Sequence, residues 1–226
     1  MSGPAEGSGP SRAVEDYLKA VYKLQGDVGA VSTTALAEEL ERSAASVTNM
    51  VKALAENGLV EHTPYRGVRL TASGELTALR IIRRHRVLEL YLIEKLGFSW
   101  EDVHAEAERL EHAASDALID RMARALGEPS VDPHGSPIPT RTGEIAETAW
   151  IALGDLEDGC RGTVREVSDD SAEALRRLAD LGLFPGTEIR MVGGRPDGGT
   201  RLEVEGEAVD VERGLAETVF VEPEGT

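Results

Sequence analysis

The sequence predicts a mainly α-helical protein with a C-terminal all-β domain, and three observations support this fold class. Apolar residues recur at helical spacing between residues 14 and 126. After residue 150 the pattern changes to short β-like runs separated by glycine-rich turns. Between them, residues 127–149 hold four prolines and little apolar periodicity. The 226 residues therefore divide into small modules.

The N-terminal module is predicted to contain three helices followed by a hairpin. The helices are expected over residues 14–24, 32–40 and 43–57, where Asn57-Gly58 gives a helix-stop signal. Two short strands, 59–63 and 68–71, would be joined through Pro64, Tyr65, Arg66 and Gly67. Three helices and a hairpin in this order are typical of a winged helix-turn-helix.

The charge is distributed unevenly along the chain. A net charge of −17 argues at first against DNA binding, which depends on neutralised phosphates. Residues 33–86, however, hold eight Lys/Arg and six Asp/Glu, whereas residues 87–226 hold 13 and 31. An N-terminal domain that faces DNA is therefore compatible with an acidic remainder, whose excess charge could hold cations or simply provide solubility.

Small polar residues begin the predicted third helix and suit entry into a major groove. The candidates for base contact are Ser43, Ala45, Ser46 and Asn49. Phosphates would be contacted by Lys52, Arg66 and Arg69, which would set the register without specifying sequence. A helical hairpin with another role remains the alternative for this segment.

Three further helices are expected over residues 72–96, 100–112 and 115–126. Their apolar positions exceed the needs of one small core, which indicates either a homodimer interface or an ordinary intramolecular core. Beyond residue 150, runs at 162–167, 187–192, 201–204 and 218–221, with a helix at 172–181, fit a small β-barrel.

Three of the five histidines fall within 28 residues, each with carboxylates at helical distance. His85 and Glu89 share one helix face at i and i+4. His104, Glu108, Glu111 and His112 form a second stripe at i, i+4, i+7 and i+8. If these stripes face other helices, a bound cation would offset the cost of burying carboxylates. A solvated charged face is the alternative.

The ends and the single cysteine exclude several classes of protein. No apolar run approaches the roughly 18 residues needed to cross a bilayer. Residues 1–13 lack the apolar core of a secretory signal and are expected to be a disordered tail. Cys160 cannot form an internal disulfide. We therefore expect a cytoplasmic protein without a membrane partner.

The chain resembles the diphtheria toxin repressor family of metal-dependent regulators over nearly its full length. The resemblance lies in EDYLKAVYKL, RRHRVLELYL, HAEAERLEHAAS, PHGSPIP and the barrel-like tail. It implies a three-domain homodimer that binds double-stranded operator DNA. The implied parts are a winged-helix domain at 14–76, a helical dimerisation and metal-binding domain at 77–128, a proline-rich linker at 129–149 and an SH3-like barrel at 150–226.

The resemblance also implies two metal sites. The primary site would use Asp16, Glu108, Glu111 and His112, and the ancillary site would use His85, Glu89 and His104. Glu166 and Asp169 fall near the positions at which three-domain members borrow ancillary ligands from the barrel. Lys19 stands where two-domain manganese regulators have a carboxylate, which disfavours their binuclear arrangement.

Asp16 and Glu108 stand where iron-responsive members have Met and Cys. Oxygen in place of soft sulfur favours Mn(II), although Fe(II) or other divalent transition metals can bind such a site. The resemblance thus implies a manganese-dependent repressor of metal-uptake genes, with Mn(II) as corepressor.

Three alternatives are open at this point. An iron-sensing repressor would keep the same fold and answer to Fe(II). A metallohydrolase could use the same ligands to activate water. The barrel could also contact the metal-binding domain or the linker, for example by binding the segment Pro133–Pro139.

Overall fold

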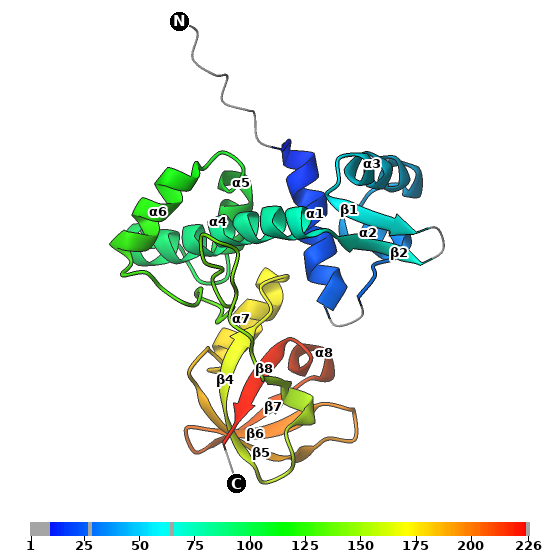
Figure 1. Cartoon of the computed structure of the whole chain (residues 1–226). Helices are drawn as coiled ribbons and strands as arrows, with labels where there is room; N and C mark the ends of the chain where they lie inside the picture. The colour runs from blue at the N-terminus through cyan, green and yellow to red at the C-terminus, as the bar shows by residue number, and fades with distance from the viewer. Residues whose placement is uncertain (1–9, 27–28, 64–65, 225–226) are drawn as a thin grey trace, which may run out of the picture. The chain divides into compact units, whose positions relative to one another are not determined.

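A computed structural model of the chain describes residues 10–26, 29–63 and 66–224 (Figure 1). The described residues form two compact units: the first contains those up to residue 83 together with 139–144, and the second contains residues 84–138 and those from 145 onward. Helix α4 (Ala72–Leu96) contributes residues to both units. Among the described residues, no helix is long and apolar enough to cross a membrane.

The first unit contains α1 (Arg12–Gln25), α2 (Thr33–Glu39), α3 (Ala44–Glu56), β1 (Val60–Thr63) and β2 (Gly67–Leu70). Ser32 and Ser43 cap α2 and α3 by accepting backbone N–H groups through their hydroxyls. The strands pair antiparallel, with Val60 opposite Leu70. This order confirms the winged helix-turn-helix. Pro64 and Tyr65, expected in the hairpin turn, lie outside the described residues.

The core of the first unit contains one apolar face from each helix. Leu18 and Val21 of α1, Leu36 of α2 and Val51 of α3 are fully buried together with Val68 of the hairpin. Helix α1 begins at Arg12, two residues before the start expected from apolar spacing. Helical backbone therefore extends into the stretch expected as a tail.

The helical part of the second unit contains the end of α4 together with α5 (Val103–Leu110) and α6 (Asp116–Ala125). Helix α5 is shorter than the expected 100–112, because Glu111 to Ala113 form a turn. Ser115 caps α6 by accepting the N–H of Leu118, so the chain must leave one helix before it enters the next. Glu111 and His112 consequently lie in this turn.

The C-terminal domain is a six-stranded antiparallel sheet of the SH3-like kind, in the order β3-β8-β4-β5-β6-β7. Its strands are β3 (Ile151–Ala152), β4 (Arg161–Val167), β5 (Glu188–Gly194), β6 (Thr200–Val204), β7 (Glu207–Val211) and β8 (Val219–Pro223). Three short helical segments accompany them, η2 (Leu153–Asp155), α7 (Ala172–Asp180) and α8 (Arg213–Ala216).

Strand β7 was not predicted from the sequence, because the turn between β6 and β7 has unusual residues. Glu205 and Gly206 have φ values of 52° and 87°, the two positive values that a tight hairpin turn requires. Glutamate rarely adopts this conformation, so the turn was not expected from its residues. The fold class, mainly α with a C-terminal all-β domain, is confirmed.

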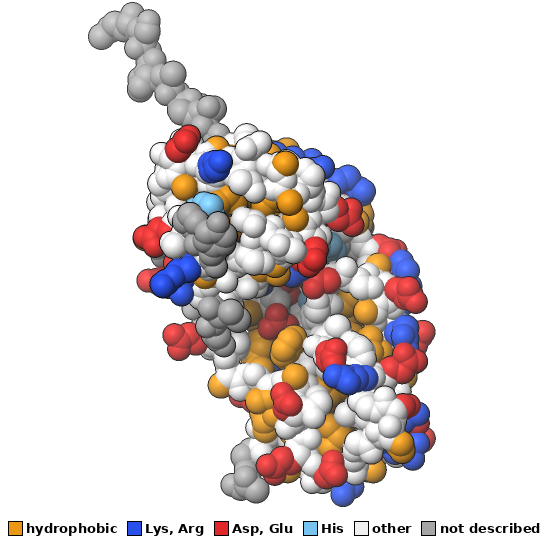
Figure 2. Space-filling model, turned by 90° about the vertical axis from the view of Figure 1, so that its right-hand side faces the viewer, with side chains coloured by type: hydrophobic (Ala, Val, Ile, Leu, Met, Phe, Trp, Pro, Cys, Tyr) orange, Lys and Arg blue, Asp and Glu red, His pale blue; other side chains and the backbone are white. Residues whose placement is uncertain are grey.

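The acidic excess of the C-terminal domain lies on its surface and is partly paired. Acidic and basic side chains intermingle over this domain, at the bottom of the view in Figure 2. Arg165 pairs with Glu222 at 2.6 Å, and Arg201 pairs with Asp210 at 2.6 Å. These exposed pairs support solubility more than stability.

Residues 132–138, within the expected linker, form a buried loop. Asp132 accepts the N–H groups of His134 (2.8 Å) and Ser136 (3.0 Å) through Oδ1, and the carbonyl of His134 accepts the N–H of Val167 in β4 (2.9 Å). Gly135 has a φ of 93° and approaches β4 so closely that a Cβ would lie 1.8 Å from the carbonyl oxygen of Arg165. Only glycine fits this position.

Substituting Gly135→Ala is expected to destabilise the protein by about 2–4 kcal/mol, because it adds a clash with backbone to the strain of a positive φ. Gly127→Ala is the matched control, since Gly127 has a φ of 83° but no neighbouring atom within 4 Å of an added Cβ. Chemical denaturation of both variants measures the difference. Equal losses in the two variants would contradict the close approach of the loop to β4.

Candidate metal centre

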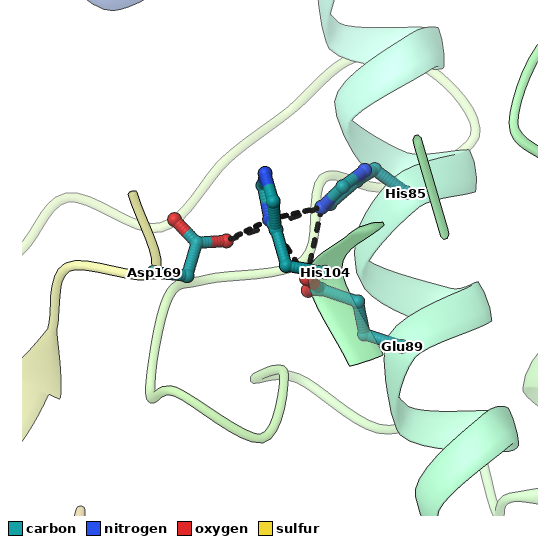
Figure 3. Close-up of side chains that lie close together, drawn as sticks. All are labelled: His85, Glu89, His104 and Asp169. Atoms are coloured by element: carbon teal, nitrogen blue, oxygen red, sulfur yellow. Dashed lines mark hydrogen bonds and ion pairs between the residues drawn. The ribbon is translucent and has the colours of Figure 1, made fainter. Parts of the chain in front are cut away.

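Four potential ligands converge within the second unit from three segments of the chain (Figure 3). His85 and Glu89 lie one turn apart on α4, His104 lies on α5, and Asp169 lies in the segment between β4 and α7. The i, i+4 spacing places the first two on one helix face. The C-terminal domain therefore contributes one side chain to a cluster otherwise built from helices.

The spacing of the four ligand atoms fits one coordination sphere. His85 Nε2 lies 2.9 Å from Glu89 Oε1 and 3.1 Å from His104 Nδ1. His104 Nδ1 lies 3.0 Å from Asp169 Oδ2, and His85 Nε2 lies 3.9 Å from the same oxygen. Ligands bound at about 2.0–2.2 Å from a metal lie roughly 3.0–3.6 Å from one another. The two nitrogens and two oxygens therefore suit a divalent transition metal.

Burial and hydrogen bonding determine the charges in this cluster. Burial alone would raise the pKa of Glu89, but hydrogen bonds with His104 and His85 lower it to about 2. Burial alone would lower the pKa of His104, but hydrogen bonds with Asp169 and Glu89 raise it to about 10. Burial would likewise raise the pKa of Asp169, yet His104 holds it well below its ordinary value. Without a cation, the His104 proton thus stabilises the carboxylates.

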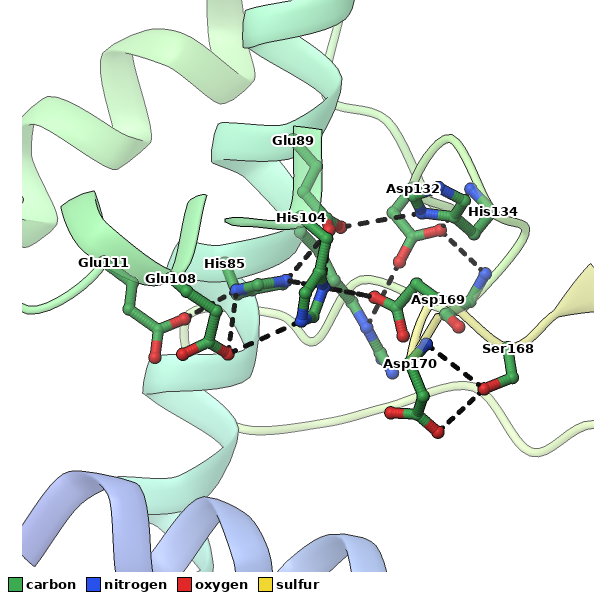
Figure 4. Close-up of polar contacts among 12 residues, drawn as sticks. His85, Glu89, His104, Glu108, Glu111, Asp132, His134, Ser168, Asp169 and Asp170 are labelled. Atoms are coloured by element: carbon green, nitrogen blue, oxygen red, sulfur yellow. Dashed lines mark hydrogen bonds and ion pairs between the residues drawn. The ribbon is translucent and has the colours of Figure 1, made fainter. Parts of the chain in front are cut away.

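The imidazole of His85 faces carboxylates at both ring nitrogens (Figure 4). Its Nδ1 lies 2.7 Å from Glu111 Oε2 and 3.8 Å from Glu108 Oε1, and these three groups form a second potential ligand set. Glu111 Oε1 in turn lies 3.3 Å from His112 Nε2. Glu108, Glu111 and His112, predicted as primary ligands, thus lie close to the first cluster through His85.

Two further predicted ligands, Asp16 and Glu166, come from α1 and β4. Asp16 lies on α1 in the first unit, where its carboxylate is 3.9 Å from Arg12 Nε, so a site that includes Asp16 stays a prediction. Glu166 lies on β4 and accepts a hydrogen bond from the Ser136 hydroxyl. Among the described residues, Glu166 belongs to none of the potential ligand groups, whereas Asp169 does.

Two residues near the cluster were not expected from the sequence. His134 is fully buried, and its Nδ1 lies 3.9 Å from Glu89 Oε2. Asp132 is also buried, and burial together with the charge of Glu89 raises its pKa to about 8 despite Arg86, whose Nε lies 3.4 Å away. Neither residue lies on a predicted helix with a histidine or carboxylate three or four positions away. The only available signal was the motif PHGSPIP.

The predicted DNA-reading residues lie on the first unit. Ala45, Ser46 and Asn49 are exposed on α3, while Val47 and Val51 on its other face are buried. Ser43 is the N-cap of this helix. Lys52, Arg66 and Arg69, predicted to contact phosphates, are also exposed. This arrangement leaves the polar face of α3 available to a ligand.

Three family models cover most of the chain. Residues 11–68 match the iron dependent repressor N-terminal DNA binding domain, and residues 71–140 match the iron dependent repressor metal binding and dimerisation domain. Residues 151–223 match the FeoA domain. The order of these domains agrees with the helices, the ligand cluster and the sheet described above.

Individual relatives agree with this match. The iron-dependent repressor IdeR of Mycobacterium leprae is 30% identical over 221 residues, covering 92% of this chain and 96% of that protein. The diphtheria toxin repressor of Corynebacterium glutamicum is 29% identical over 219 residues, covering 92% and 95%. A solved manganese-dependent transcriptional repressor in complex with manganese is 37% identical, with a TM-score of 0.87 and coverage of 93% of this chain and 100% of that one.

The fold, the ligand cluster and these similarities define a metal-dependent, DNA-binding transcriptional repressor. The chain belongs to the iron-dependent repressor family, which includes the diphtheria toxin repressor. The resemblance found in the sequence motifs is therefore confirmed. Because the proteins of this family are repressors and not enzymes, the metallohydrolase alternative is not supported.

Binding of a divalent cation to the cluster of His85, Glu89, His104 and Asp169 is expected to release a proton from His104. Its pKa near 10 keeps it protonated at neutral pH, so a cation must displace that proton, and the apparent affinity should rise about tenfold per pH unit between pH 6.5 and 8. Glu89, with a pKa near 2, contributes no proton in this range. Calorimetry of Mn²⁺ binding in two buffers of different ionisation enthalpy counts the protons. Affinity independent of pH would contradict this expectation.

Proposed function

We propose that this chain is a manganese-responsive repressor of metal-uptake genes, with Mn(II) as its corepressor. The protein would act in the cytoplasm. The observation that carries the proposal is the donor set, in which every candidate ligand offers nitrogen or oxygen and none offers sulfur. Such donors suit Mn²⁺ better than sulfur-containing sets do. The similarity to a manganese-dependent repressor at 37% identity supports the same assignment.

The proposed ancillary site is the cluster of His85, Glu89, His104 and Asp169. The proposed primary site uses Asp16, Glu108, Glu111 and His112, as the family resemblance implies. A bound divalent cation supplies the charge that neutralises the carboxylates of the primary site. In its absence, the three carboxylates repel one another and α1 is held less firmly.

Asp16 then has a specific role, because it is the only proposed ligand in the first unit. A cation bound by Asp16 together with the ligands proposed in the helical domain would tie α1 to that domain. Fixing α1 would favour the arrangement of two recognition helices that matches successive major grooves. The protein would thereby bind double-stranded operator DNA as a homodimer when metal is abundant.

Exposed apolar residues of the helical domain support the proposed dimer. Leu96, Phe98 and Leu118 are 61%, 38% and 44% exposed, respectively. Large apolar side chains that are exposed at the surface become favourable contacts when another molecule covers them. The match of residues 71–140 to a dimerisation domain points to the same part of the chain.

An iron-sensing repressor is the second candidate function, favoured by the similarity to IdeR over nearly the full length of both chains. Carboxylate and imidazole ligands also bind Fe²⁺, and the intrinsic order of affinities favours Fe²⁺ slightly over Mn²⁺. The two candidates share every residue of the site. They differ in the cation that raises operator affinity at its physiological concentration.

A titration of the full chain against genomic DNA fragments, with buffered Mn²⁺ and with anaerobic Fe²⁺, tests the proposal. We expect Mn²⁺ to raise affinity for selected fragments by at least about tenfold. Asp16→Ala and Glu108→Ala should abolish this increase while leaving the metal-free affinity unchanged. Activation by Fe²⁺ alone would favour the iron-sensing candidate, and metal dependence that survives both substitutions would contradict the proposed primary site.

Substitutions on α3 separate base reading from phosphate contact. Asn49→Ala should cost about 1–3 kcal/mol of binding to the selected fragment and relax its sequence preference. Lys52→Ala should weaken binding to all sequences alike and reduce the salt dependence by about one phosphate contact. Fluorescence anisotropy over a range of salt concentrations measures both effects. An Asn49→Ala protein with unchanged sequence preference would contradict the proposed orientation of α3.

A further inference from the structure

Trp100 belongs to the helical part of the second unit, yet its side chain packs against the core of the C-terminal domain. It lies three residues before the start of α5 at Val103. Its ring centroid is 5.0 Å from that of Phe184, which follows α7. Among the residues that the structure describes, it is the only hydrophobic side chain before residue 150 that packs against this buried core. The indole therefore joins the two parts of the second unit.

The indole N–H and the carbonyl of Trp100 both bond to the buried loop of residues 132–138. The indole N–H donates to the carbonyl of Pro133 at 3.0 Å, and the Trp100 carbonyl accepts from Nε2 of His134 at 3.0 Å. The loop in turn bonds to β4, because the carbonyl of His134 accepts the N–H of Val167 at 2.9 Å. The indole is thus held from two sides, by the loop and by the C-terminal core.

The segment that carries Asp169 is attached on both sides to the residues around Trp100. Before it, β4 ends at Val167, which the loop holds. After it, α7 contributes Arg176, whose guanidinium pairs with Asp102 at 2.6 Å. Both side chains of this pair are more than half exposed, so the pair by itself contributes little. The packing of Trp100 removes apolar surface from water and is the stronger attachment.

We infer that Trp100 is a positioning residue of the proposed ancillary site, which places Asp169 beside His104 by holding the C-terminal domain. His104 follows Trp100 by four residues, so the apolar contact and this ligand lie on one short stretch of chain. His104 Nδ1 lies 3.0 Å from Asp169 Oδ2 (Figure 3). The indole thereby keeps the fourth ligand in place for a cation.

A cation would otherwise have to bring Asp169 into the cluster itself. Asp169 follows His104 by 65 residues, and closing a loop of that length costs conformational entropy. If the closure accompanied metal binding, it would lower the affinity. The packing of Trp100 closes almost the same loop before a cation arrives. This inference rests on the proposed ancillary site and deepens it.

Two substitutions of Trp100 separate packing from hydrogen bonding. Trp100→Ala removes the ring, whereas Trp100→Phe keeps an aromatic ring near Phe184 and lacks the indole N–H that bonds to Pro133. Trp150→Ala is the matched control, because Trp150 is also partly buried but is not among the described residues that pack against this core. If packing positions Asp169, only Trp100→Ala lowers the affinity for Mn²⁺ substantially.

The experiment uses the full chain carrying Asp16→Ala, which removes a ligand of the proposed primary site and leaves the residues of the second unit unchanged. Calorimetry and Mn²⁺ electron paramagnetic resonance give the affinity of the remaining site. We expect Trp100→Ala to bind Mn²⁺ about 10- to 100-fold more weakly than this parent, and Trp100→Phe and Trp150→Ala to bind within about threefold of it.

The same substitutions in a chain that also carries Asp169→Ala show whether Trp100 acts through Asp169. The fourth ligand is then absent, so removing the indole should change the affinity by less than about threefold. An indole that only supports the fold would instead lower the affinity equally in both backgrounds. Thermal unfolding with a chelator present measures the stability of each variant separately from metal binding.

The inference is overturned if Trp100→Ala binds Mn²⁺ as well as the parent, if Trp100→Phe or Trp150→Ala loses as much affinity, or if the loss persists in the Asp169→Ala background. If Asp169→Ala abolishes binding altogether, Trp100→Ala and its two controls decide. If Trp100→Ala does not fold, Phe184→Ala replaces it, because Phe184 is 40% exposed and forms the other half of the ring contact.

Failure of the proposed site gives a different result. If the Asp16→Ala parent binds no Mn²⁺, or if Asp169→Ala leaves its affinity unchanged, the proposed ancillary site is wrong and the inference fails with it. If Asp169→Ala lowers the affinity and Trp100→Ala does not, the site stands and only the positioning role of Trp100 is wrong.

Discussion

Two carboxylates, those of Glu89 and Glu111, are fully buried and lie against opposite ring nitrogens of His85. Burial of a charged group requires a partner of opposite charge or a good hydrogen-bond donor. This requirement ties α4 to α5 and to the turn that follows α5. It also brings Asp169 of the C-terminal domain against His104. Much of the second unit is thus arranged around the need to compensate buried negative charge.

The residues closest to this constraint were predictable from local spacing. His85 and Glu89 follow the i, i+4 rule on an unbroken helix, and both side chains lie where this rule places them. Val47, Val51 and Leu54 similarly define the inward face of α3, which leaves Asn49 outside. In each case, helical geometry alone fixes the relation between the residues, so no knowledge of tertiary structure is needed.

Other parts depended on tertiary contacts that spacing does not encode. The stripe from His104 to His112 was expected on one continuous helix, but α5 ends at Leu110, where the chain turns toward the Ser115 cap. Glu166 and Asp169 were equally plausible as ligands, and only the direction of the segment after β4 separates them. His134 lies in a proline-rich stretch that indicates a linker, although the residue is fully buried.

The position of Asp169 has a consequence for the order in which the protein is made. Asp169 follows His104 by 65 residues and lies beyond the first long strand of the C-terminal sheet. During synthesis, Asp169 leaves the ribosome well after the other three ligands, His85, Glu89 and His104. A nascent chain therefore has an incomplete ligand set until the sheet has formed, and metal bound by all four side chains would close this 65-residue loop as a reversible cross-link. Only a chain that has been synthesised as far as the C-terminal sheet can therefore acquire the complete cluster.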